Sequence, residues 1–236
     1  MLPGKTKTDC EAPMNEKSYI PASARGLKSR FIYLLIAILG MIIGSPFLDE
    51  LLPFRHIRTI LLTIIFISSI YAVSQKKQHI MIAAALALPM LISLWSFHIY
   101  KLVFVFIISE VFAALFIAFT IYCLIDFILK QQEITREVIY AAVIVYFLMA
   151  LLWFFAYSIL EYFYPNSFSY AGGPREDMYR FLYFSFITIT TLGYGDIIPM
   201  TEKASALAVL EAVSGQMYLV VIVAWLVGMH VSRRSR

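Results

Sequence analysis

The chain contains little charge: Asp, Glu, Lys and Arg make up 14% of its 236 residues, whereas 61% are hydrophobic. Its mean hydropathy is +0.80. A soluble domain could not hide this much apolar surface from water, so the composition excludes a soluble fold and indicates a membrane protein with several spanning segments. Because backbone polar groups in lipid must be satisfied within each segment, we expect an all-α membrane protein.

Cysteine is also scarce. Cys10 lies in the polar N-terminal stretch and Cys123 in an apolar run, and this pair gives no disulfide framework and no metal site. The sequence offers no nucleophile–base pair, metal cluster or phosphate-binding loop, so we expect no enzyme, no cofactor and no small-molecule substrate. The basic residues flank apolar runs rather than forming a patch, which gives nucleic-acid binding no support.

Six apolar runs are each about 18 residues or longer, enough to cross a bilayer core of about 30 Å. They span residues 31–48, 57–74, 80–97, 102–125, 138–160 and 204–229. A seventh run, 178–190, is too short to cross. We predict that it forms a re-entrant helix, which is tolerated at membrane depth only when protein surrounds it.

The distribution of basic residues predicts the orientation. The first 30 residues are polar and of mixed charge, and we expect a cytoplasmic tail followed by a retained span. With six spans, 13 of the 19 Lys and Arg fall on the side that holds both termini. The positive-inside rule makes that side cytoplasmic, and it predicts a multi-pass protein of the cell (inner) membrane.

A distinctive motif lies between the short run and the last long run: Thr190-Thr191-Leu192-Gly193-Tyr194-Gly195-Asp196. Glycine permits backbone angles that strain other residues. A cation stripped of water needs oxygen ligands, and successive carbonyl groups supply them when they point at one axis. The stretch resembles the selectivity filter of potassium channels, whose usual core is T-V-G-Y-G. Leu192 departs from it where valine is commoner, and keeps an aliphatic side chain.

The resemblance implies a filter with defined roles. It implies that K⁺ binds to Thr191, Leu192, Gly193, Tyr194 and Gly195, with backbone oxygens of the first four as ligands. Tyr194 would pack outward as a spacer, and Asp196 would place acid at the pore mouth. Because the pore unit occurs once in the chain, the resemblance implies a homotetramer in the lipid bilayer.

The flanking segments extend the resemblance. Residues 181–188 resemble a pore helix, with Tyr183 and Phe184 where many members have paired tryptophans. Gly215 lies 20 residues after Gly195, at the offset of the family's gating hinge, although helix packing without motion is an equal interpretation. Helical spacing places four residues on one face, which the resemblance implies lines the cavity: Gln216, Leu219, Val223 and Val227.

The first four apolar runs, in residues 31–130, take the position of a voltage sensor, ahead of a pore domain at 137–232. A sensor needs several basic residues on its fourth helix. The fourth run has none between Lys101 and Lys130, so we expect little voltage gating.

Two acids interrupt the apolar runs. For Glu110 we favour an ion pair with Arg58 over an independent role. We expect Glu211 to hydrogen-bond behind the pore helix, with proton sensing as the weaker alternative.

The resemblance therefore implies a potassium-selective channel that conducts K⁺ passively, with K⁺ as its permeant ion. Two alternatives stay open. If Leu192 or the aromatic residues around the filter loosen it, the protein is a weakly selective cation channel. If the filter is vestigial, the protein is a non-conducting subunit.

Overall fold

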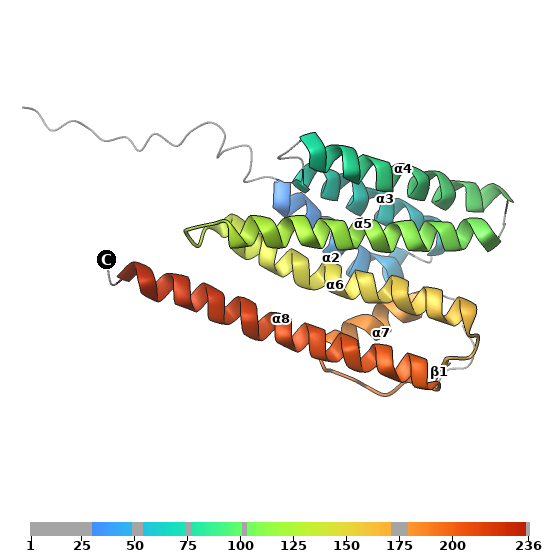
Figure 1. Cartoon of the computed structure of the whole chain (residues 1–236). Coiled ribbons are helices and arrows are strands. Elements are labelled where there is room, and N and C mark those ends of the chain that lie inside the picture. The colour runs from blue at the N-terminus through green and yellow to red at the C-terminus, as the bar shows by residue number, and fades with distance from the viewer. Residues whose placement is uncertain (1–29, 49–53, 74–76, 101–102, 171–178, 235–236) are drawn as a thin grey trace, which may run out of the picture.

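A computed structural model describes residues 30–48, 54–73, 77–100, 103–170 and 179–234. The N-terminal half contains α2 (Arg30–Leu48), α3 (Phe54–Val73), α4 (Lys77–Tyr100) and α5 (Val103–Leu129). The C-terminal half contains α6 (Arg136–Phe163), β1 (Phe168–Tyr170), α7 (Tyr179–Ile189), β2 (Ile197–Pro199) and α8 (Glu202–Arg234). The described part of the chain is thus helical apart from two short strands (Figure 1).

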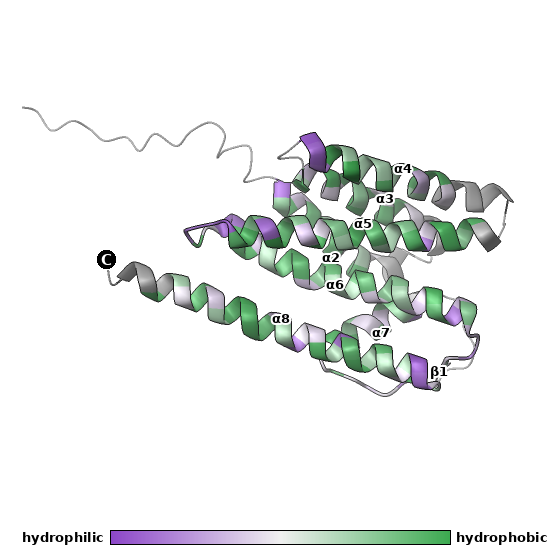
Figure 2. Ribbon diagram, in the orientation of Figure 1, coloured by the Kyte–Doolittle hydropathy of each residue, from purple (hydrophilic) through white to green (hydrophobic). Residues whose placement is uncertain are grey.

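Each predicted apolar run coincides with one helix, and the short run forms the 11-residue α7. Hydrophobic residues run along the helices, and polar residues gather toward helix ends (Figure 2). Within the described residues, three helical segments are long and apolar enough to cross a membrane: 105–129, 136–163 and 202–229. The described parts of α2, α3 and α4 give shorter apolar stretches, so six spans remain a prediction.

Helix α6 is the centre of the arrangement. It packs against α5 and α2 on one side and against α7 and α8 on the other (Figure 1). The sequence explains this position, because α6 presents buried residues over most of its circumference, as a helix surrounded by protein should. By contrast, α8 is apolar but largely exposed along its length.

A short antiparallel ladder joins β1 to β2, with Phe168 opposite Pro199 and Tyr170 opposite Ile197. It ties the end of α6 to the start of α8. The ring of Phe168 is buried and contacts the rings of Phe181 and Phe184 on α7 at centroid distances of 5.3 Å. The described residues are mostly helical, as expected for an all-α protein, and this two-stranded ladder was not predicted.

The strands lie outside the helices, and the pKa of one of their side chains, Tyr170, is raised. Burial raises the pKa of the Tyr170 phenol, and the charge of Arg180 opposes this shift. The Arg180 guanidinium lies 4.2 Å from the centre of the Tyr170 ring, which fastens the start of α7 to β1.

Aromatic rings pack between the N-terminal helices α3 and α5, and a substitution can test how much this packing stabilises the protein. Phe116 on α5 is fully buried, and its ring meets that of Phe66 on α3 edge to face at 4.9 Å. We expect Phe116→Ala to lower the free energy of unfolding in detergent by about 3 kcal/mol, because it leaves a cavity. Leu115→Ala is the control, since Leu115 is half exposed, and should cost less than about 1 kcal/mol. Equal losses from the two variants would contradict this packing.

Candidate functional site

The loop after α7 has an unusual backbone. Thr191, Gly193 and Gly195 have φ angles of 58°, 48° and 78°, whereas Leu192 and Tyr194 between them do not have positive φ. The predicted need for glycine at positions 193 and 195 is confirmed. The left-handed Thr191 was not predicted, because a β-branched residue with positive φ is an outlier that the surrounding structure must enforce.

This alternation determines where the backbone groups point. In an extended chain of uniform hand, successive carbonyl groups face opposite sides. When residues with positive and negative φ alternate, this opposition is lost, and successive carbonyl groups can face the same side. We therefore expect the positive φ angles of Thr191, Gly193 and Gly195 to bring the carbonyl oxygens of this loop toward one side.

The loop's N–H groups are used to attach it to α7. The N–H groups of Leu192 and Gly193 both donate to the Ile187 carbonyl, at 2.8 Å and 3.1 Å. The N–H of Thr191 donates to the Thr188 carbonyl at 2.9 Å. Within the described residues, no backbone N–H donates to a carbonyl of residues 191–195. Those oxygens are therefore available to a ligand.

The loop is exposed on the surface of the single chain. The side chain of Tyr194 is 67% exposed and that of Leu192 is 55% exposed. The expected outward packing of Tyr194 therefore has no counterpart within one chain. Asp196 is half-buried, and its Oδ1 accepts a hydrogen bond from the Ile197 N–H at 3.2 Å.

A hydrogen bond from α6 holds the end of α7. The Tyr146 hydroxyl on α6 donates to the carbonyl of Ile189, the last residue of α7, at 2.9 Å. The Thr190 hydroxyl donates to the Phe186 carbonyl at 2.6 Å, so it bonds to the backbone of α7. Sequence reasoning missed Tyr146, because α6 contains many aromatic residues and nothing distinguishes this one.

Gly215 on α8 lies directly against Ile189. A Cβ at position 215 would overlap the Ile189 side chain and would lie 3.0 Å from its carbonyl oxygen. This contact supports the packing interpretation of Gly215, while the hinge remains a prediction. One turn further along, the Tyr218 hydroxyl donates to the Ala142 carbonyl at 2.7 Å, and its ring stacks on that of Tyr146.

The carboxyl group of Glu211 on α8 is hydrogen-bonded to α7 and α6. It is fully buried, and its carboxyl group forms hydrogen bonds with the Tyr157 hydroxyl on α6 and the Ser185 hydroxyl on α7. The prediction that Glu211 hydrogen-bonds behind the pore helix is confirmed. Its two partners were not predicted, although an acid in an apolar run requires polar neighbours somewhere.

The residues predicted to line a cavity follow one face of α8. Gln216 is half-buried, whereas Leu219, Val223 and Val227 are exposed in the single chain. Their role as a lining stays a prediction.

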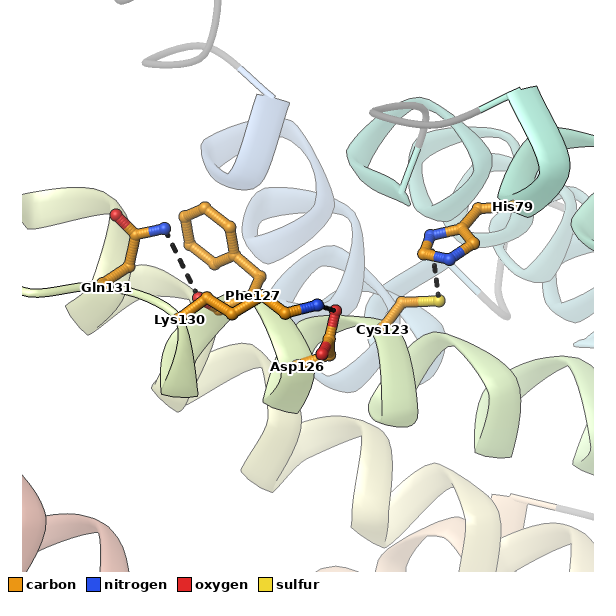
Figure 3. A network of polar contacts seen from close by, with 6 residues as sticks. All are labelled: His79, Cys123, Asp126, Phe127, Lys130 and Gln131. Carbon is orange, nitrogen blue, oxygen red and sulfur yellow. Dashed lines mark hydrogen bonds and ion pairs between the residues drawn. The ribbon is translucent and has the colours of Figure 1, made fainter.

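Two further polar positions lie in the N-terminal helices. Glu110 is buried on α5, but the Arg58 side chain lies outside the described residues, so their pair stays a prediction. His79 on α4 contacts Cys123 on α5, with Nδ1 and Sγ 3.8 Å apart, beside an ion pair between Asp126 and Lys130 at 2.6 Å (Figure 3). The described residues contain no group of three metal-ligating side chains.

The contact of Gly215 with Ile189 yields a double-mutant test. We expect Gly215→Ala to lower the free energy of unfolding in detergent by about 1–3 kcal/mol, because the added methyl group overlaps Ile189. Combining it with Ile189→Ala should recover part of that loss, with a coupling energy of about 1 kcal/mol.

Gly40→Ala on α2 is the matched control, since a Cβ there meets nothing within 4 Å. It should be neutral or stabilising, because alanine is the better helix former. Simple additivity of the two substitutions at 215 and 189 would show that the overlap does not matter.

Comparison with known proteins identifies one related family. Residues 133–231 match a family model described as "Ion channel", which is less than half of the chain and runs from the start of α6 almost to the end of α8. No curated protein and no solved structure matches. The matched segment contains α7, the loop that follows it and Gly215. The apolar helices and this similarity to a non-enzymatic class indicate a membrane protein whose C-terminal segment is similar to ion channels.

Proposed function

We propose that four copies of this chain form a potassium-selective channel that conducts K⁺ passively across the cell membrane. The observation that carries the proposal is the backbone of residues 191–195. Its φ angles alternate in sign, the N–H groups of its first three residues donate to α7, and its carbonyl groups have no backbone donor within the described residues. Such a strip of oxygens is what a dehydrated K⁺ ion needs as ligands.

Four chains are required because one chain supplies only one side of an ion path. A dehydrated ion must be surrounded by oxygens, and a closed ring of four identical loops provides them around a symmetry axis. The exposure of Leu192 and Tyr194 in the single chain supports this assembly, since neighbouring copies would cover them. The exposed apolar surface of α8 is likewise suited to neighbouring copies and lipid.

Charges near the loop favour a cation. The C-terminal end of α7 leads into the loop, and a helix carries about half a negative charge at that end. Four copies of Asp196 would add a ring of acid on the far side of the filter. Below the loop, the α8 face of Gln216, Leu219, Val223 and Val227 would line a cavity whose valine rings can exclude water.

Flux through reconstituted protein tests the proposal. We expect liposomes containing the purified protein to take up K⁺ much faster than Na⁺. Gly193→Ala should reduce K⁺ uptake by at least about tenfold, because φ is +48° at this position and a side chain in the left-handed region costs about 1–2 kcal/mol per chain.

The control for this substitution is Gly40→Ala, which adds the same methyl group in open space on α2. Its K⁺ uptake should equal that of the unmodified protein. Undiminished uptake by Gly193→Ala would refute the filter assignment. Equal K⁺ and Na⁺ uptake would favour the weakly selective channel, and no uptake at all would favour the non-conducting subunit.

The response to voltage is a separate prediction. The helix in the sensor position, α5, has no Lys or Arg along its length, so it has no positive charge to move through the field. One charge crossing the field yields about 2.3 kcal/mol per 100 mV, so without such charges the open probability should change little between negative and positive potentials. Recording from planar bilayers checks this, and a steep conductance–voltage curve would show that other groups sense the field.

A further inference from the structure

The buried carboxyl group of Glu211 joins three helices. Glu211 extends from α8, one of its oxygens meets the Tyr157 hydroxyl of α6, and the other meets the Ser185 hydroxyl of α7. Ser185 in turn donates to the Ala150 carbonyl on α6 at 2.7 Å. All three side chains are buried, with exposures of 0% for Glu211, Ser185 and Tyr157.

The number of protons available to these contacts indicates whether the Glu211 carboxyl group is protonated. It contains three oxygen-to-oxygen contacts: Tyr157 with Glu211, Glu211 with Ser185, and Ser185 with Ala150. Each hydrogen bond needs one proton. The two hydroxyl groups supply one proton each, and the backbone carbonyl supplies none. The third proton has to come from the carboxyl group, which then donates to Ser185 while Ser185 donates to Ala150.

An ionised Glu211 would leave one of the three contacts without a proton between its two oxygens. It would also enclose a negative charge among apolar helices. No ion pair of Glu211 occurs among the described residues. Among the described residues, the Tyr157 phenol on α6 and the Ser185 hydroxyl on α7 contact it. The Tyr146 phenol on α6, which bonds to Ile189, lies close enough to be influenced by its charge. None of these groups is a cation.

The bridge that Glu211 forms between Tyr157 and Ser185 ends close to the proposed pore loop, residues 191–195. Ser185 lies two residues before Ile187, whose carbonyl holds the N–H groups of Leu192 and Gly193. A displacement of Ser185 would therefore move the anchor of the loop. Because α7 is an 11-residue helix, its position depends on such contacts with its neighbours.

We infer that Glu211 holds a proton and, as a neutral acid bridging Tyr157 and Ser185, positions α7 and thereby the carbonyl groups of the pore loop. Glu211 is a positioning residue and does not touch the ion. The inference rests on the proposed channel function, and one of its two tests is independent of that function.

The first test compares two variants of Glu211 in the liposome assay. In Glu211→Gln, the amide oxygen accepts from Tyr157 and the amide nitrogen donates to Ser185, which reproduces the bonds of the neutral acid. We expect K⁺ uptake and K⁺/Na⁺ selectivity within about twofold of the unmodified protein. Glu211→Leu fills a similar volume without hydrogen bonds, and we expect uptake to fall at least tenfold.

Thr120→Val is the control for removing a buried polar group from a helix. Thr120 on α5 is buried, and its hydroxyl donates only within its own helix, to the Phe116 carbonyl at 2.9 Å. Its uptake should not change. If Glu211→Gln conducts as poorly as Glu211→Leu while the unmodified protein conducts well, the bridge works through a charge and the inference is wrong.

The second test reads the proton directly and does not need a conducting channel. The infrared difference spectrum between the unmodified protein and Glu211→Gln should contain the carbonyl band of a protonated carboxylic acid. Ser185→Ala should shift that band, because it removes the acceptor of the proton. A difference spectrum that shows carboxylate bands instead would overturn the inference. Absence of K⁺ uptake by every variant, together with the acid band, would refute the channel function and leave the protonated bridge intact.

Discussion

The loop of residues 191–195 depends on hydrogen bonds that fasten it to the end of a short helix. The last carbonyl groups of a helix have no partner within it, and at α7 the carbonyls of Ile187 and Thr188 accept the N–H groups of the loop. That arrangement satisfies the donors of residues 191–193 and leaves the carbonyl oxygens of the loop without a backbone donor among the described residues. The left-handed residues Thr191 and Gly193 lie in this bonded stretch, and Gly195 continues the alternation of φ sign.

Much of the C-terminal half keeps α7 in place. Its apolar side is buried through Phe181, Leu182, Phe184 and Ile187. Its polar contacts are spaced along the helix: Ser185 bonds to α6 and α8 at its middle, and Ile189 is held by Tyr146 and Gly215 at its end. A helix of this length cannot cross a bilayer, and protein on several sides satisfies its backbone and side chains. The ladder between β1 and β2 closes the outer edge of the same unit.

The helices could be predicted from the sequence because each is encoded by a continuous apolar run. The short α7 was predicted for the same reason. The unusual backbone conformation at Gly193 and Gly195 was predicted because glycine adopts angles that strain other residues. The burial and hydrogen bonding of Glu211 could also be predicted, since a carboxyl group in an apolar helix needs hydrogen-bond partners.

Other features carried no local signal. The strands β1 and β2 have three residues each and pair across the whole of α7, so neither alternation nor a tight turn reveals them. The left-handed Thr191 results from its bond to Thr188 rather than from its own preference. Tyr146 and Tyr157 act through single hydroxyl groups in a helix rich in aromatic residues, where sequence cannot separate a bonded phenol from an apolar contact.

The proposed channel requires that backbone oxygens of Thr191, Leu192, Gly193 and Tyr194 from four chains replace the water around a permeating ion. Crystals of the assembled protein soaked in thallium(I), which substitutes for K⁺, can be measured by anomalous diffraction. We expect a row of anomalous peaks on a fourfold axis, each surrounded by these oxygens. A monomer, or an assembly whose axis carries no peak between the four loops, would refute the proposed ion path.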